Sequence, residues 1–318
     1  MRVVWLTGFG GPEVLVAGEA PDPEHGPGQA LVDVAFAGIT FIETTFRATG
    51  TGPFAAEVPM VPGNGVGGAV AAVGADVDPA LVGTRVVTST GGAGGYAERV
   101  VVGAESLVPV PDGLALDAAV ALLADGRTAM MLVDAAAVRG GDRVLVEAAA
   151  GGVGTLIVQL AHGAGARVIG AAGGEAKLAL AASLGAEVTV DYTEPGWQRT
   201  AGPVDVVFDG VGGAIARTAF GRLGDGGRMV SFGLASGSWS DVSDAEAAAR
   251  GVRKIGLQRP DPAASRALTA RALAAAADGR LRPVIGARFP LACAAEAHAA
   301  IEARATVGKT LLHTAPVA

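Results

Sequence analysis

The sequence has a single cysteine, Cys293, among its 318 residues. One thiol cannot form an internal disulfide, and it excludes a zinc lobe built from several cysteines. The residues around it, 291–301, are rich in alanine and typical of a helix. We therefore interpret Cys293 as a small core residue rather than as a nucleophile.

Long apolar runs and blocks of like charge are also missing. No run of about 18 apolar residues occurs, which argues against a membrane-spanning helix, and glycine interrupts residues 1–10 too early for a secretory signal. A net charge of −7 is unlike the basic surface that nucleic acids require. We therefore expect a cytoplasmic protein that binds neither membranes nor nucleic acid.

The chain is long enough for roughly two domains, and half of its residues are hydrophobic. Short β-type runs separated by glycine and proline fill residues 1–118, with strands expected at 2–5, 30–35, 68–73, 84–87 and 98–102. From residue 119 helical stretches alternate with strands expected at 143–146, 167–170, 187–190, 204–208, 228–232 and 252–257. This alternation is typical of a parallel, doubly wound sheet.

The end of the chain is too short to form a domain alone. An alanine-rich helix expected at 262–278 leads to a tail that ends in a strand at 309–313. We expect this tail to return to the N-terminal domain. The fold class is therefore α/β, with one domain made of residues 1–118 plus 261–318 and a second domain, residues 119–260, inserted into it.

A glycine turn joins the first strand of the inserted domain to a helix. Residues 144–154 read VLVEAAAGGVG, and a helix follows at 155–162. The spacing Ala149-x-Gly151-x-x-Gly154 is a dinucleotide fingerprint with alanine at its first glycine position. Unpaired N–H groups at the helix start would hold a diphosphate. We expect these backbone contacts from Ala150, Gly151, Gly152, Val153 and Gly154; the alternative is a tight turn without a ligand.

Eight segments, in this order, resemble the zinc-independent medium-chain dehydrogenases/reductases of the quinone oxidoreductase (zeta-crystallin-like) family. They are FGGPEVL (9–15), GITFIET (38–44), VPG (61–63), GGYAE (94–98), VPVPDG (108–113), AAAGGVG (148–154), DVVFDGVG (205–212) and GGRMVSFG (226–233). The resemblance implies a GroES-like catalytic domain, an inserted Rossmann domain that binds NADPH, and reduction of quinones or α,β-unsaturated carbonyls.

Zinc ligands are not expected. Zinc-dependent relatives carry a cysteine near position 38 and Gly-His-Glu near position 63, where this chain has Gly38-Ile-Thr and Gly63-Asn-Gly. A catalytic zinc needs about three histidine, cysteine or carboxylate ligands. The histidines show no ligand spacing, and we interpret them as surface or packing residues: His25, His162, His298 and His313.

The second strand of the inserted domain bears on the choice between NADPH and NADH. Residues 171–174 contain no acid that would repel a 2′-phosphate, and Lys177 could pair with it. In the family this position often holds a lysine, and Tyr192 matches a tyrosine near the adenosine phosphate; Gly173 belongs to the same group. Glu175 argues the other way, and the alternatives are a solvated Lys177 and a surface Tyr192.

The resemblance also assigns the nicotinamide end. Loops after the fourth and fifth strands line the nicotinamide in the family, and here they contain Gly210, Val211, Phe232 and Gly233. Thr128 matches a threonine that faces the nicotinamide. Its alternative is a hydroxyl that only caps the N-terminus of a helix.

The expected substrate segment departs from the family. Close relatives show Asn-Phe-Ile-Asp-Thr-Tyr where this chain has Thr40-Phe-Ile-Glu-Thr-Thr45. Without the phenol we expect water to supply the proton, Thr40 to donate one hydrogen bond, and Phe41, Thr45 and Phe46 to line the pocket. Glu43 is either a solvated or salt-bridged carboxylate or, as an alternative, a pocket acid.

Two other functions stay open. An enoyl-thioester reductase would share the fold and the cofactor, and a protein that binds NADPH without turnover could be a sensor or structural protein. The expected last strand, 252–257, would leave an unpaired sheet edge that favours a homodimer. The expected partner is otherwise a small quinone or enone.

Overall fold

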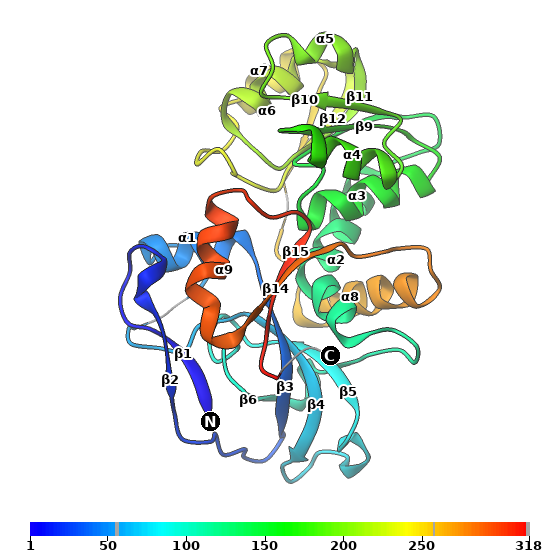
Figure 1. Cartoon of the computed structure of the whole chain (residues 1–318). Helices are drawn as coiled ribbons and strands as arrows, with labels where there is room; N and C mark the ends of the chain where they lie inside the picture. The colour runs from blue at the N-terminus through cyan, green and yellow to red at the C-terminus, as the bar shows by residue number, and fades with distance from the viewer. Residues whose placement is uncertain (55–56, 257, 316–318) are drawn as a thin grey trace. The chain divides into compact units, whose positions relative to one another are not determined.

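The computed structural model describes residues 1–54, 57–256 and 258–315 (Figure 1). The chain divides into two compact units. The first consists of Met1–Ala124, Pro262–Gly279 and Pro283–Ala318, and the second of Asp125–Asp261 and Arg280–Arg282. Helix α2 (Leu116–Ala136) begins in the first unit and ends in the second, so the domain boundary predicted after residue 118 falls inside a helix.

The first unit is built on a seven-stranded sheet. The strand order is β14-β15-β3-β4-β5-β7, with β6 paired to β3, and β1 and β2 form a separate antiparallel pair. The strands are β1 (Arg2–Leu6), β2 (Leu15–Glu19), β3 (Gln29–Ile39), β4 (Gly65–Val73), β5 (Arg85–Ser89), β6 (Arg99–Gly103), β7 (Val108–Pro109), β14 (Ile285–Pro290) and β15 (Lys309–His313).

The C-terminal strand completes this sheet. β15 pairs antiparallel with β3, with Leu312 opposite Ala37. The tail therefore returns to the N-terminal sheet, as predicted. The helices of the first unit, besides the start of α2, are α1 (Phe41–Thr49), α8 (Pro262–Ala277) and α9 (Ala294–Glu302).

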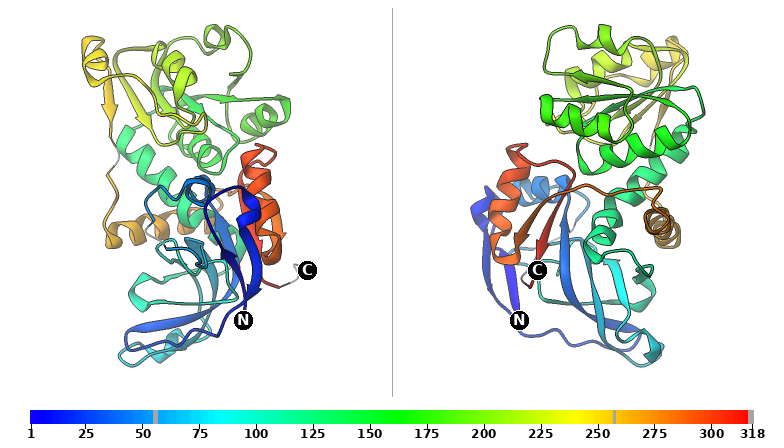
Figure 2. Two further views of the ribbon diagram at one scale, coloured as in Figure 1. Left: turned by 90° about the vertical axis from the view of Figure 1, so that its left-hand side faces the viewer. Right: turned by 45° about the vertical axis from the view of Figure 1, so that its right-hand side comes forward.

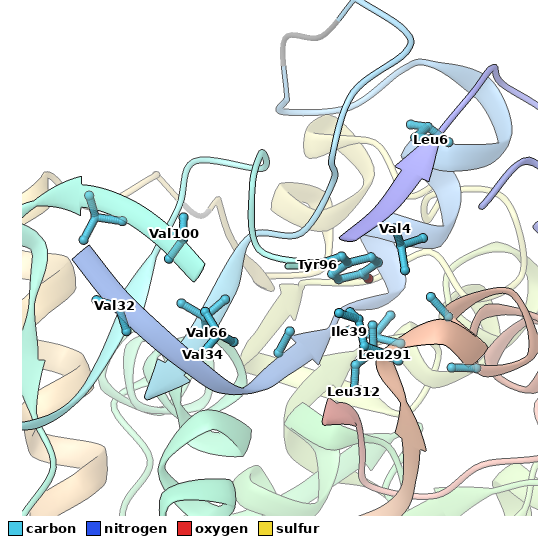
Figure 3. Packing of buried hydrophobic residues seen from close by; sticks show 14 of the residues in the cluster. Val4, Leu6, Val32, Val34, Ile39, Val66, Tyr96, Val100, Leu291 and Leu312 are labelled. Atoms are coloured by element: carbon cyan, nitrogen blue, oxygen red, sulfur yellow. The ribbon is translucent and has the colours of Figure 1, made fainter. Parts of the chain in front are cut away.

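The core of the first unit gathers between these strands (Figure 3). Val32 and Val34 alternate toward it from β3 because successive side chains of a strand point to opposite faces. Tyr96 lies within the same core, and its hydroxyl is 2.9 Å from Nε2 of His298 on α9. Burial, and then the charge of Arg47, lower the pKa of His298 to about 3, so this histidine is a neutral packing residue.

The second unit is a parallel, doubly wound sheet, which confirms the predicted fold class. Its strand order is β10-β9-β8-β11-β12-β13, and helices lie on both faces (Figure 2). The strands are β8 (Arg143–Glu147), β9 (Arg167–Ala172), β10 (Val188–Asp191), β11 (Val204–Asp209), β12 (Leu223–Ser231) and β13 (Arg253–Ile255); the helices are α3 (Gly152–Gly163), α4 (Glu175–Ser183), α5 (Trp197–Ala201), α6 (Gly213–Phe220) and α7 (Asp244–Ala249).

Two predictions need correction or restriction. Cys293 ends a short 3-10 turn and is half-buried, so its placement in the core is wrong. The expected strand 252–257 is β13 at the sheet edge, but Leu257 lies outside the described residues. Among the described helices, none is long and apolar enough to cross a membrane.

Candidate functional site

A close backbone contact shapes the glycine turn between β8 and α3. A Cβ added at Gly154 would lie 2.2 Å from the carbonyl oxygen of Ala148, which is far inside contact distance. Ala148 itself has φ 49°, a left-handed conformation that is uncommon outside glycine. The turn therefore brings the start of α3 directly against the end of β8, as the fingerprint predicts.

The start of α3 is suited to an anion. Gly151 is the N-cap, and no described side chain caps it. The first N–H groups of a helix have no intrahelical acceptor, and the helix dipole adds partial positive charge there. Gly152 and Val153 are partly exposed at this end, whereas Ala150 is 3% exposed. The backbone N–H groups of Gly152 and Val153 are therefore placed to hold a diphosphate, whereas Ala150 and Gly154 are buried and the N–H of Gly151 donates to the carbonyl oxygen of Ala148.

A second group lies beyond β9. A Cβ on Gly173 would meet Thr193 at 3.1 Å and the ring of Tyr192 at 3.6 Å, so the tyrosine lies beside this glycine. Tyr192 also packs against the core of the second unit and is half-buried, so the reading as a surface aromatic is wrong. Lys177 is half-buried in the first turn of α4.

The sequence reading missed an acid at this place. Asp191 ends β10 opposite Ala172, and its Oδ2 accepts a hydrogen bond of 2.8 Å from the N–H of Gly174. Oδ1 accepts bonds from the N–H and hydroxyl of Thr193, and these bonds lower the pKa of Asp191. Only the strand register brings this carboxylate to the end of β9. Its place directly after a predicted strand was the available signal.

The two predicted nicotinamide loops contact each other. A Cβ on Gly210 would lie 2.7 Å from the ring of Phe232, and one on Gly233 would lie 2.5 Å from the carbonyl oxygen of Gly210. Asp209 holds the first loop, because its Oδ1 accepts bonds from the N–H groups of Val211 and Gly212. The N–H of Val211 is therefore already engaged, and Val211 is 2% exposed.

Glu147 is a second acid that the sequence reading missed. It ends β8, is fully buried, and lies beside Asp209, because β8 and β11 run parallel in adjacent register. Among the described residues, neither carboxyl oxygen of Glu147 has a hydrogen-bond partner. Burial first, and then the negative charge of Asp209, raise its pKa well above the ordinary value of 4.5.

Thr128 lies in the interior of α2, on the part that belongs to the second unit. The helix begins twelve residues earlier at Leu116, so the alternative of an N-terminal cap is wrong. Thr128 is half-buried.

In the first unit, Thr40 and Glu43 form a bonded pair at the start of α1. Oε2 of Glu43 accepts the N–H of Thr40 at 2.7 Å and the hydroxyl of Thr40 at 2.6 Å, and Oε1 accepts the N–H of Asn64 at 2.9 Å. Glu43 is 6% exposed, so the reading as a solvated carboxylate is wrong. Burial raises its pKa, although these bonds and the nearby charge of Lys309 oppose the rise.

The aromatic residues of α1 separate into two environments. Phe41 is 42% exposed, whereas Phe46 is 3% exposed and packs edge to face against Phe9 and Phe54. Phe46 is therefore a core residue, and the prediction that it lines the pocket is wrong; the same role for Phe41 stays a prediction. Thr45 is half-buried, and its hydroxyl donates to the carbonyl oxygen of Phe41 at 3.4 Å.

Comparison with known proteins connects both units to one family. A model of the alcohol dehydrogenase GroES-like domain matches residues 26–112, and a model described as zinc-binding dehydrogenase matches residues 184–312. A quinone oxidoreductase of Pseudomonas aeruginosa is 36% identical over 97% of this chain and 98% of its own. This chain belongs to the quinone oxidoreductase family of the medium-chain dehydrogenases/reductases.

Other relatives agree. A probable quinone oxidoreductase of Schizosaccharomyces pombe is 36% identical over 91% of this chain and 90% of its own. Escherichia coli quinone oxidoreductase complexed with NADPH superimposes with a TM-score of 0.88 at 28% identity, covering 98% of this chain and all of the other. The quinone oxidoreductase of Thermus thermophilus, also solved with NADPH, gives 0.83 at 33% identity, with coverage of 98% and 100%.

This member of the quinone oxidoreductase family matches a model named for zinc, so its possible ligands matter. Within residues 1–54, 57–256 and 258–315, no group of three or more histidine, cysteine, aspartate or glutamate residues could hold a metal ion. Independence from zinc stays a prediction.

The buried Glu147 predicts how stability changes with pH. Above about pH 4.5 the unfolded chain loses this proton while the folded chain keeps it, so stability falls as pH rises until the raised pKa is passed, at up to about 1.4 kcal/mol per pH unit. Glu147→Gln removes this loss. Its free energy of unfolding, measured by urea denaturation, should rise relative to that of wild type as pH increases above about 4.5, until the raised pKa is passed.

The matched control is Glu187→Gln, which changes an exposed glutamate of the same unit. It should leave the difference from wild type independent of pH. A constant difference for Glu147→Gln as well would contradict the raised pKa.

Proposed function

We propose that this protein is an NADPH-dependent reductase of quinones or other α,β-unsaturated carbonyls. One observation carries the proposal: beyond the carboxyl ends of the parallel strands, a Cβ on Gly154 or on Gly233 would lie 2.2 Å or 2.5 Å from a backbone carbonyl oxygen, so neither place admits a side chain. Ligands bind at this edge of such sheets. The solved relatives complexed with NADPH support the choice of cofactor.

The second unit would hold NADPH mainly through its backbone. The N–H groups of Gly152 and Val153, at the partly exposed start of α3, would bind the diphosphate. The N–H of Gly151 already donates to the carbonyl oxygen of Ala148 at 2.8 Å, and Gly154 is buried, so these two glycines would shape the turn. Lys177, Gly173 and Tyr192 would surround the phosphorylated ribose, with Asp191 shaping the loop at Gly174. The loops with Gly210, Val211, Phe232 and Gly233 would flank the nicotinamide.

Bound NADPH supplies the hydride, and the protein orients the acceptor and excludes water. The hydroxyl of Thr40 would donate to the substrate oxygen, Phe41 would offer an aromatic wall, and Thr45 would lie one turn further along α1. Thr128 of α2 would face the nicotinamide. We place this reaction in the cytoplasm, in line with the single cysteine.

A substrate panel tests the function directly. Purified protein should oxidise NADPH when a quinone or an enone is added, and it should do so slowly or not at all with enoyl-thioesters. Faster turnover of an enoyl-thioester would favour the alternative reductase. Tight NADPH binding without turnover of any acceptor would favour a sensor or structural protein.

Cofactor preference should depend on Lys177. A charge-assisted contact with the 2′-phosphate is worth on the order of 1 to 2 kcal/mol, so Lys177→Ala should weaken NADPH binding about tenfold. NADH affinity, measured in the same fluorescence titration, should barely change. Lys177→Arg is the control that keeps the charge. Equal losses for both cofactors would remove Lys177 from the site.

We also propose a homodimer through the edge strand β13. This strand pairs with β12 on one side only, within the described residues, and an open edge favours pairing with a second copy. Light scattering should give twice the chain mass of 31.2 kDa. Ile255→Lys on β13 should shift the mass toward the monomer, whereas Val188→Lys on the opposite edge strand β10 should not. A wild-type monomer at micromolar concentration would contradict the proposal.

A further inference from the structure

The bonded pair Thr40 and Glu43 places a buried acid directly behind the hydroxyl expected to face substrate. We propose that Glu43 supplies the substrate proton through Thr40, so that the two side chains form a short proton relay. The inference rests on the proposed reductase function and adds a proton source to it. Water would then return a proton to Glu43 instead of protonating the product directly.

The geometry of the pair suits a relay. Thr40 is half-buried at the N-cap of α1, and its hydroxyl oxygen lies 2.6 Å from Oε2 of Glu43. The carboxyl group cannot swing away easily, because the N–H groups of Thr40 and Asn64 bind its two oxygens from different segments of the chain. The donor and the acceptor of the proton are therefore held in hydrogen-bond contact.

Helix capping alone explains only part of this arrangement. A glutamate three residues after a threonine N-cap commonly binds back to the cap, and such residues lie near a helix end. Glu43 also reaches Asn64, outside the helix, and is almost completely removed from water. A capping role does not require either feature.

Charged and titratable groups around Glu43 come from two further elements. Lys309 of β15 is 3% exposed, and its charge favours the carboxylate. Tyr96, which precedes β6, lies close enough for the charge of Glu43 to raise its pKa, although burial is the larger cause. Burial of Glu43 outweighs the contribution of Lys309, so the pKa of Glu43 is raised and the neutral acid persists to higher pH.

The protonation state of Glu43 decides what Thr40 can do. When Glu43 is charged, it accepts the hydroxyl proton of Thr40, which then cannot donate to substrate. When Glu43 is neutral, its O–H donates to the oxygen of Thr40, and the threonine proton is directed outward. A substrate oxygen therefore meets a donor only with the neutral acid.

Two protons move as the substrate is reduced. Hydride from NADPH adds to the conjugated carbonyl compound, whose oxygen becomes an anion as NADP⁺ forms. The Thr40 O–H bond breaks and its proton joins that oxygen, while the proton of Glu43 moves to the oxygen of Thr40. Glu43 is left as a carboxylate and takes a proton from water after product leaves.

The relay makes the rate of reduction depend on pH. The relay works while Glu43 is protonated, so the rate should be highest at low pH and fall as pH rises through the raised pKa. This fall in rate is the descending limb of the pH–rate profile. Single-turnover oxidation of bound NADPH by a quinone, followed by stopped flow between about pH 5 and pH 9, measures the limb. Wild type should show it.

Three variants complete the test. Glu43→Gln and Thr40→Val should each slow the single turnover about tenfold to a hundredfold and remove the limb. The first removes the proton that the relay delivers, because an amide does not give up its proton, and the second removes the hydroxyl that passes the proton on. The double variant should be no slower than the slower single one. NADPH affinity should stay unchanged in all three.

Glu296→Gln is the matched control, since Glu296 is an exposed first-turn glutamate of α9 in the same unit. It should keep both the rate and the limb. If Glu43→Gln does not fold, Thr40→Val alone decides, because it leaves the buried carboxylate in place. If wild type is active and the descending limb persists in either variant, the relay is overturned. If wild type is inactive with every acceptor, the proposed function is overturned instead.

Discussion

Close backbone contact at the carboxyl edge of the parallel sheet is the constraint on which the rest of the second unit depends. Gly154 packs against the carbonyl of Ala148, and Gly233 packs against that of Gly210. A single methyl group at either place would force the helix or the loop away from the sheet. The candidate site therefore depends on glycines, whose missing side chains would let a ligand approach the backbone N–H groups.

Each unit also places a buried acid behind the residues assigned to chemistry. Glu147 lies beside Asp209, which holds the loop proposed to flank the nicotinamide, and Glu43 is hydrogen-bonded to Thr40. Both carboxyl groups lose hydration on folding, which raises their pKa values. They differ in hydrogen bonding: Glu43 accepts three bonds, whereas Glu147 has no partner among the described residues. The bonds hold the first carboxyl group in place, as the proposed relay requires, whereas the second carboxyl group mainly lowers stability at high pH.

Strands were predicted more accurately from the sequence where their residues are hydrophobic and buried. The predicted bounds of the buried strands in the second unit lie close to the observed ones. The exception is β12, which begins at Leu223. The prediction missed its start because residues 224–226 are exposed and give no apolar signal. The strand β2 was missed for the same reason, since its residues are largely exposed. The strand β14 was missed although its burial alternates, because none of its residues is fully buried. Phe46 shows the opposite error: an aromatic residue beside an expected pocket proved to belong to the core.

The sequence by itself determined the two-part architecture, the glycine turn and the family, because these depend on local periodicity and on motifs read in order. The tertiary structure alone decided which polar groups meet. Strand register brings Asp191 to Gly174, and chain folding brings Glu43 to Asn64 and Glu147 to Asp209. Such contacts join residues far apart in the chain, and their electrostatic effect depends on burial, which no local pattern of residues specifies.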